Sequence, residues 1–174
     1  MRLFSHRSRW TMTFVFLLLP VSMAYAQDRG SALSAGDAER LRSIADDPSQ
    51  RVLAFVGFLD DRAKAVEKLS SGPRKPGRED DLHEQFEQFV SIADEFNDNL
   101  DDYSEHHRDV RKALRNLVQA TERWAVMLRT PEENEAYSVS RRLALEAVRD
   151  LHEEAVEMIA EQKTWFAKHP PPKP

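Results

Sequence analysis

The fold is decided by residues 78–130, which read REDDLHEQFEQFVSIADEFNDNLDDYSEHHRDVRKALRNLVQATERWAVMLRT. This stretch contains no glycine and no proline, the two residues that most readily interrupt a helix. Its inward positions recur after three and four residues in turn, the heptad spacing of a helix that keeps one edge against a partner. We call these positions the seam: Leu82, Phe86, Phe89, Ala93, Phe96, Leu100, Tyr103, His107, Val110, Leu114, Leu117, Thr121, Trp124 and Leu128. The pattern predicts one unbroken helix of about 50 residues, about 75 Å long.

Turn signals bound this stretch on both sides. The segment SGPRKPG at residues 71–77 ends a preceding helix that we expect over residues 48–70, with Asp47 as its N-cap. The tetrapeptide TPEE at residues 130–133 is a helix-start signal, so a last helix is expected from there to about residue 168. Because both connections are short, the outer helices should fold back onto the long one. The sequence thus predicts an all-α fold: an elongated antiparallel three-helix coiled-coil bundle with one very long central helix.

One alternative architecture stays open. Ser104 could act as the N-cap of a new helix, which would break the long helix near Tyr103 to Glu105. A break there would produce a compact four-helix bundle. The apolar phase that runs through residues 78–130 without a slip favours the straight helix.

The heptads also predict which polar side chains meet across the last hairpin. A fold at Thr130 places Thr121 against Ser140 and His107 against Glu154, so that polar residues face polar residues. His107 and Glu154 are therefore a candidate buried polar pair. Such a pair would fix the helix register through a hydrogen bond, or would serve as a pH-sensitive latch or a ligand site.

The N-terminal region reads as a leader for export. Arg2, Arg7 and Arg9 precede a short apolar run over residues 14–23, and an A-x-A cleavage signal ends at Ala26. The apolar run is shorter than the ~20 residues of a membrane span. We therefore expect a periplasmic or secreted protein after cleavage following Ala26, with no membrane span in the mature chain.

Four segments make up the predicted domain organisation. Residues 1–26 form the cleaved secretory signal peptide, and residues 27–35 form a flexible lead-in. Residues 36–168 form a single helical domain. Its first short helix begins near Gly36, because Ser34 and Asp37 have the spacing of a capping box. Residues 169–174, which contain four prolines, form an extended tail because proline cannot continue a helix.

Charge and cysteine content exclude several classes of function. The chain carries a formal net charge of −5, and loss of the three leader arginines makes the mature chain more acidic still. An acidic protein is poorly suited to nucleic acid, whose binding depends on neutralised phosphates. The chain has no cysteine, which excludes disulfides, thiolate metal sites and a lipid anchor on cysteine.

No arrangement of residues predicts catalysis. The histidines of the mature chain do not occur in the Glu-x-x-His spacing of metal sites in helical bundles. No nucleophile elbow, ordered triad spacing or phosphate-binding glycine-rich loop is present either. We expect no catalytic residues, no bound metal and no cofactor.

Residues 52–59, VLAFVGFL, suggest a different role. The run is apolar almost all the way round a helix and must be covered on more than one side. In the predicted register Leu53 and Phe58 point away from the long helix, which makes them a candidate partner surface. Gly57 within the run is explained either by the close approach of another backbone or by simple tolerance.

The sequence is best explained by an exported, non-enzymatic helical protein that acts as a protein–protein interaction or scaffold module in the cell envelope. Its partner is another protein or a second copy of the same chain. One alternative is a bundle that binds a small apolar ligand or haem between its core aromatics. Those residues are Phe86, Phe89, Phe96, Tyr103, Trp124 and Trp165. A chaperone-like envelope protein is a further alternative.

Overall fold

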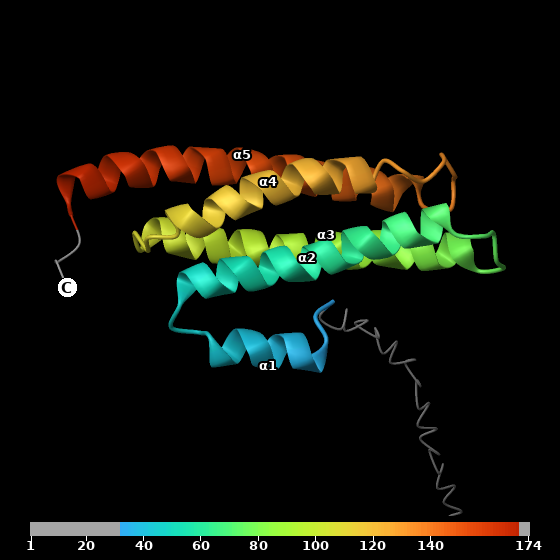
Figure 1. The fold of residues 1–174 in the computed structure, drawn as a ribbon, viewed down its shortest axis with the longest axis horizontal. Helices are drawn as coiled ribbons and strands as arrows, with labels where there is room; N and C mark the ends of the chain where they lie inside the picture. Colours follow the sequence, from blue (N-terminus) through green and yellow to red (C-terminus); the bar gives the residue numbers. More distant parts are fainter. Residues whose placement is uncertain (1–31, 171–174) are drawn as a thin grey trace, which may run out of the picture.

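The computed structural model describes residues 32–170, and within them it contains five α-helices and no strand (Figure 1). The helices are α1 (Ala35–Ser43), α2 (Pro48–Ser71), α3 (Arg78–Glu105), α4 (Arg111–Met127) and α5 (Ser138–Lys168). The predicted signal peptide, most of the lead-in and the last residues of the tail lie outside the described residues. None of the five helices combines the length and the apolar character that crossing a membrane requires.

Helices α2 to α5 form an antiparallel four-helix bundle in which consecutive helices run in opposite directions (Figure 1). Helix α2 packs against α3 and α4, and α5 packs against the same two helices. Helices α3 and α4 follow each other in the chain but lie across the bundle diagonal, without close backbone contact between them. One end of the bundle therefore carries the α3–α4 loop together with the C-terminal end of α5.

The prediction of one long central helix is wrong, and so is the three-helix bundle built on it. The chain leaves helical geometry after Glu105 and resumes it at Arg111. The four-helix alternative is closer to the structure, but Ser104 does not cap a new helix: it lies inside α3, and Val110 is the N-cap of α4. The apolar phase failed to reveal the break because Val110 lies outside a helix and is still fully buried, so the phase continues through the loop.

The seam itself is correctly predicted as the core. Every seam position is buried except His107, which is exposed in the α3–α4 loop. The aromatic side chains of the core pack on one another: the rings of Phe55 and Phe96 are stacked at 4.9 Å, and Phe89 meets Trp124 edge-on at 5.7 Å. The heptad pattern therefore identifies the buried face of each helix correctly, although it joins α3 and α4 into one helix.

The last helix begins later than predicted. The TPEE segment does not start α5, and residues 128–137 form a loop that Tyr137 anchors. The Tyr137 hydroxyl donates a hydrogen bond to the Glu132 carbonyl at 2.6 Å, and its ring packs on Phe86. The longer loop shifts the register, so that the Thr121 hydroxyl lies 2.9 Å from His152 Nδ1 and does not face Ser140.

Local capping signals are confirmed at two helix starts. Ser34 and Asp37 form a complete capping box on α1, and the Asp47 side chain accepts a hydrogen bond from the Gln50 N–H at the start of α2. These signals depend only on residues close in the chain, which is why they can be read without knowledge of the tertiary fold.

Candidate functional site

Helix α3 ends in a Schellman motif that has a histidine in the glycine position. The Arg108 N–H donates to the Tyr103 carbonyl at 2.9 Å, and the His107 N–H donates to the Ser104 carbonyl at 3.1 Å. This pattern requires a left-handed residue after the helix, and His107 supplies it with a φ of 50°. A side chain in this conformation costs about 1–2 kcal/mol that glycine would avoid. Among the described residues His107 is the one non-glycine residue with positive φ.

Gln162 of α5 fixes the loop that follows this motif. Its side-chain oxygen accepts a hydrogen bond from the Val110 N–H at 3.2 Å, and its side-chain nitrogen donates to the Arg108 carbonyl at 2.9 Å. Gln162 is 4% exposed, so these bonds satisfy backbone groups that the helix break would otherwise leave buried and unpaired. The α3–α4 loop is thereby held against the last two turns of α5.

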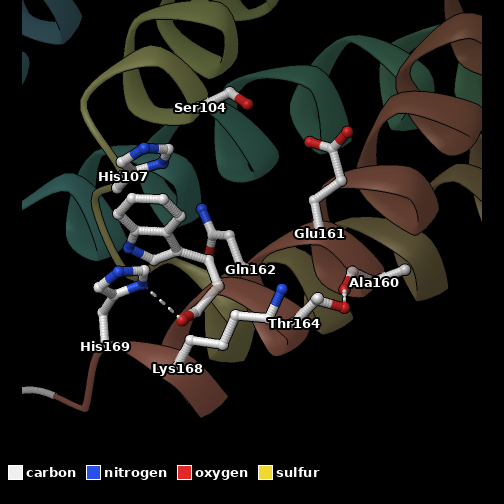
Figure 2. Close-up of a pocket in the computed structure, with 9 residues that line it drawn as sticks. Ser104, His107, Ala160, Glu161, Gln162, Thr164, Lys168 and His169 are labelled. Carbon is white, nitrogen blue, oxygen red and sulfur yellow. Dashed lines mark hydrogen bonds between the residues drawn. The ribbon is translucent and has the colours of Figure 1, made fainter.

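A groove of about 660 Å³ opens between this loop and α5. The Trp165 ring stacks on the imidazole rings of both His107 and His169. Figure 2 shows these two histidines, one in the α3–α4 loop and the other at the end of α5. The ring centroids lie 3.6 Å apart for His107 and Trp165, and 4.0 Å apart for Trp165 and His169. The other lining residues are Ser104, Ala160, Glu161, Gln162, Thr164 and Lys168. The groove therefore has an aromatic wall, with an acidic and a basic side chain among the residues around it.

Four carboxylates leading away from the groove form what we call the acidic strip: Asp101 of α3 and Glu154, Glu157 and Glu161 of α5. Burial raises the pKa of Glu154, and the charges of Asp101, Glu157 and Glu161 raise it further. The three α5 residues are spaced by three and four, which places them on one side of the helix. Glu161 also lines the groove, so the acidic strip reaches its edge.

The structure does not bring the predicted polar pair together as a buried unit. His107 is exposed and stacks on Trp165, so the prediction that it is buried against Glu154 is wrong. Glu154 is half-buried among other carboxylates. The reason is the helix break, which turns the seam away from the core at His107, together with the shifted register of α5.

Of the two residues of the predicted partner surface, one is exposed and the other is buried. Leu53 is 37% exposed, as expected, whereas Phe58 is only 5% exposed. Helix α1 lies against α2, and the Arg40 guanidinium sits over the Phe58 ring at 5.8 Å. The apolar run over residues 52–59 is therefore covered on several sides, as its composition predicts, and Phe58 belongs to the covered part.

Gln162 was not predicted as a site residue, because the predicted register placed Glu154 on the core-facing side of α5, where the structure places Ala155. The buried residues Ala144, Val148, Leu151, Ala155, Met158 and Gln162 follow steps of four and three. This phase places a glutamine on the core-facing seam, and a buried amide at such a position is a signal for a specific backbone partner. Trp165 was named for a core layer and instead lines the groove.

A second pocket of about 470 Å³ lies on the other side of the α3–α4 loop, around His106. His106 Nδ1 lies 2.9 Å from the Asp102 carbonyl oxygen and 3.2 Å from its carboxylate. Within residues 32–170 no three histidine or carboxylate side chains converge to hold a metal ion.

Comparisons of the chain with models of protein families, with curated proteins and with solved structures give no match.

Proposed function

We propose that this chain is an exported, non-enzymatic protein that binds a partner protein through the groove between the α3–α4 loop and the end of α5. The observation that carries the proposal is the conformation of His107. A histidine occupies the left-handed position where glycine would be more stable, and its ring is placed on Trp165 at the groove wall. The cost of this arrangement is explained if the imidazole and indole rings together form a recognition surface.

The character of the groove supports a protein partner. Trp165 is half-buried, which leaves part of a large aromatic side chain accessible at the end of a rigid bundle. Tryptophan residues in such positions are enriched among the residues that contribute most to protein–protein binding. Gln162 holds the loop in place, so the surface is organised before a partner arrives. Export is supported by the leader sequence, and a mature chain that begins at Gln27 by mass would test it.

The alternative of a ligand or haem held between core aromatics has less support. The aromatic residues named for that layer do not line a common space: Phe89 packs on Trp124, Phe96 packs on Phe55, and Trp165 lies at the groove. A chaperone-like role would use the same groove for many clients. Competition between several unrelated unfolded proteins for the groove would favour that role over binding to one partner.

Site-specific crosslinking tests the proposal directly. A photo-crosslinking residue replaces Thr164, which is exposed and lines the groove, in the full chain expressed with its leader. The control carries the same residue at Glu122, an exposed position on α4 outside the groove. We expect a discrete protein product at Thr164 that is absent at Glu122.

Two further variants show whether the product depends on the groove. Trp165→Ala should reduce the Thr164 product, and His107→Gly should do the same while keeping the helix-ending motif intact. A product made of two copies of the chain would identify self-association. Failure to obtain a product specific to Thr164, or a product that both variants leave unchanged, would overturn the proposed function.

A further inference from the structure

We infer that the groove and the acidic strip bind a cationic segment of the partner protein, in which lysine or arginine residues lie to one side of an apolar anchor residue. This inference rests on the proposed function and specifies the chemistry of the partner. It depends on the charges of the described residues around the groove and on the position of the Trp165 ring.

The four carboxylates of the acidic strip differ from most acidic clusters on a surface in that no described basic side chain is paired with them. None of its four carboxylates forms an ion pair within 4.0 Å in the described part of the chain. Elsewhere on the surface carboxylates do find partners, such as Asp109 with Arg111 at 2.7 Å and Asp60 with Lys64 at 2.7 Å. The strip therefore concentrates like charges beside the groove, and a cation is the ligand that would relieve their repulsion.

Two helices contribute to this concentration of charge. Asp101 comes from α3 and the three glutamates come from α5, which packs against α3. The effect of Asp101 on the pKa of Glu154 agrees with carboxylates that face one another across the two helices. A partner segment lying on the surface where α3 and α5 meet would contact Asp101 as well as the three glutamates of α5.

The groove itself provides the place for an apolar anchor. Its lining includes Ala160 and the Trp165 ring, together with Ser104 and Lys168. Lys168 lines the groove as well, whereas Glu161 connects it to the acidic strip. A cationic group is favoured on the Glu161 side and disfavoured near Lys168, so the charges set the direction in which the segment lies.

Fluorescence anisotropy with designed peptides tests the inference. The probe is a labelled hexapeptide with two lysines, a glycine, a leucine and two further glycines. One comparison peptide has glutamates in place of the lysines, and another has glycine in place of the leucine. We expect saturable binding of the first peptide to the mature chain, weaker binding without the leucine, and no binding of the glutamate peptide.

Charge variants separate specific from general electrostatic attraction. The double variant Glu157→Gln and Glu161→Gln should weaken binding about tenfold. The matched control, Glu133→Gln and Glu135→Gln, removes the same charge from exposed positions in the α4–α5 loop and should leave binding within about twofold, because distant charges are screened.

Each contrary outcome has a definite meaning. Equal weakening by the two double variants, equal binding of the glutamate peptide, or a Thr164 crosslink to an acidic protein or to a second copy would overturn the cationic partner. If the Thr164 crosslink persists in any of these cases, the proposed function still stands. Loss of both the crosslink and all peptide binding would overturn the two proposals together.

Discussion

The side-chain oxygen of Gln162 accepts a hydrogen bond at 3.2 Å from the backbone N–H of Val110, which lies fifty-two residues earlier in the chain. The same amide donates to the carbonyl of Arg108. One side chain thus replaces the helical hydrogen bonds that are lost where α3 ends and α4 has not begun. The helix break is therefore stabilised by a residue of α5 as well as by the residues of the α3–α4 loop itself.

Replacement of Gln162 by methionine should destabilise the protein. The buried Val110 N–H and the Arg108 carbonyl would lose their partner, and we expect the free energy of unfolding to fall by about 2 kcal/mol. Chemical denaturation measures this change. The matched control is Gln119→Met on the exposed face of α4, which should change stability by less than about 0.5 kcal/mol. Equal stability of the two variants would show that the loop does not depend on Gln162.

Substitutions at His107 should separate backbone strain from the role of the ring. His107→Gly removes the left-handed penalty and should be at least as stable as the wild type. His107→Val places a β-branched side chain at positive φ and should lower the free energy of unfolding by about 1–2 kcal/mol. Thermal unfolding of both variants tests this order of stability. A valine variant more stable than the glycine variant would exclude the left-handed conformation.

Gly57→Ala should stabilise α2. A Cβ built at Gly57 meets no atom within 4 Å, so the hypothesis that another backbone lies close to it is not supported. Alanine in the interior of a helix is favoured over glycine by about 0.5–1 kcal/mol, and the free energy of unfolding should rise by that amount. Gly77, with a φ of 83°, is the opposite case, and Gly77→Ala should lower stability by about 1 kcal/mol. A destabilised Gly57→Ala variant would contradict the open environment of this position.

Asp60 should contribute to the loss of stability in acid. Burial alone would raise its pKa, but hydrogen bonds from Lys64 and Trp124 and the charges of Lys64 and Arg123 lower it overall. A pKa below the ordinary value of 3.8 stabilises the folded state at higher pH, and this contribution is lost as the pH falls through the lowered pKa.

Asp60→Asn should therefore be less stable than the wild type at pH 7, with a difference that shrinks below pH 4. The exposed neighbour Asp61 offers the control, since Asp61→Asn removes the same charge from the surface and should change stability at pH 7 by less than about 0.5 kcal/mol. Denaturation midpoints between pH 2 and 7 measure the effect. A difference between wild type and Asp60→Asn that grows as the pH falls would contradict the lowered pKa.

The sequence allowed prediction of features that depend on local spacing. Spacing within a few turns of helix is enough to identify the capping residues Ser34 and Asp47 and the residues of the seam that are buried in α3 and α4. The end of α3 could not be predicted in this way. The residue in the glycine position of its Schellman motif is His107, and Gln162, which holds the loop that follows, is far away in sequence. His107 was nevertheless visible as a polar residue on an otherwise largely apolar seam.

The candidate groove was even less predictable. Its aromatic wall combines the α3–α4 loop with the end of α5, and their juxtaposition depends on the ten-residue loop that shifts the register of α5. Trp165 and His107 were each singled out by residue type, but no spacing rule linked them. Tertiary packing thus determines the groove, whereas heptad spacing determines only which faces are buried.

The most direct test of the account is to measure folding stability and partner binding on the same His107→Gly protein. The account predicts a variant at least as stable as the wild type that has lost the Thr164 crosslink and binds the lysine–leucine peptide several-fold more weakly. This result would show that the histidine is kept at the helix end for binding and at a cost in stability. A His107→Gly variant that forms the crosslink and binds the peptide as tightly as the wild type would contradict it.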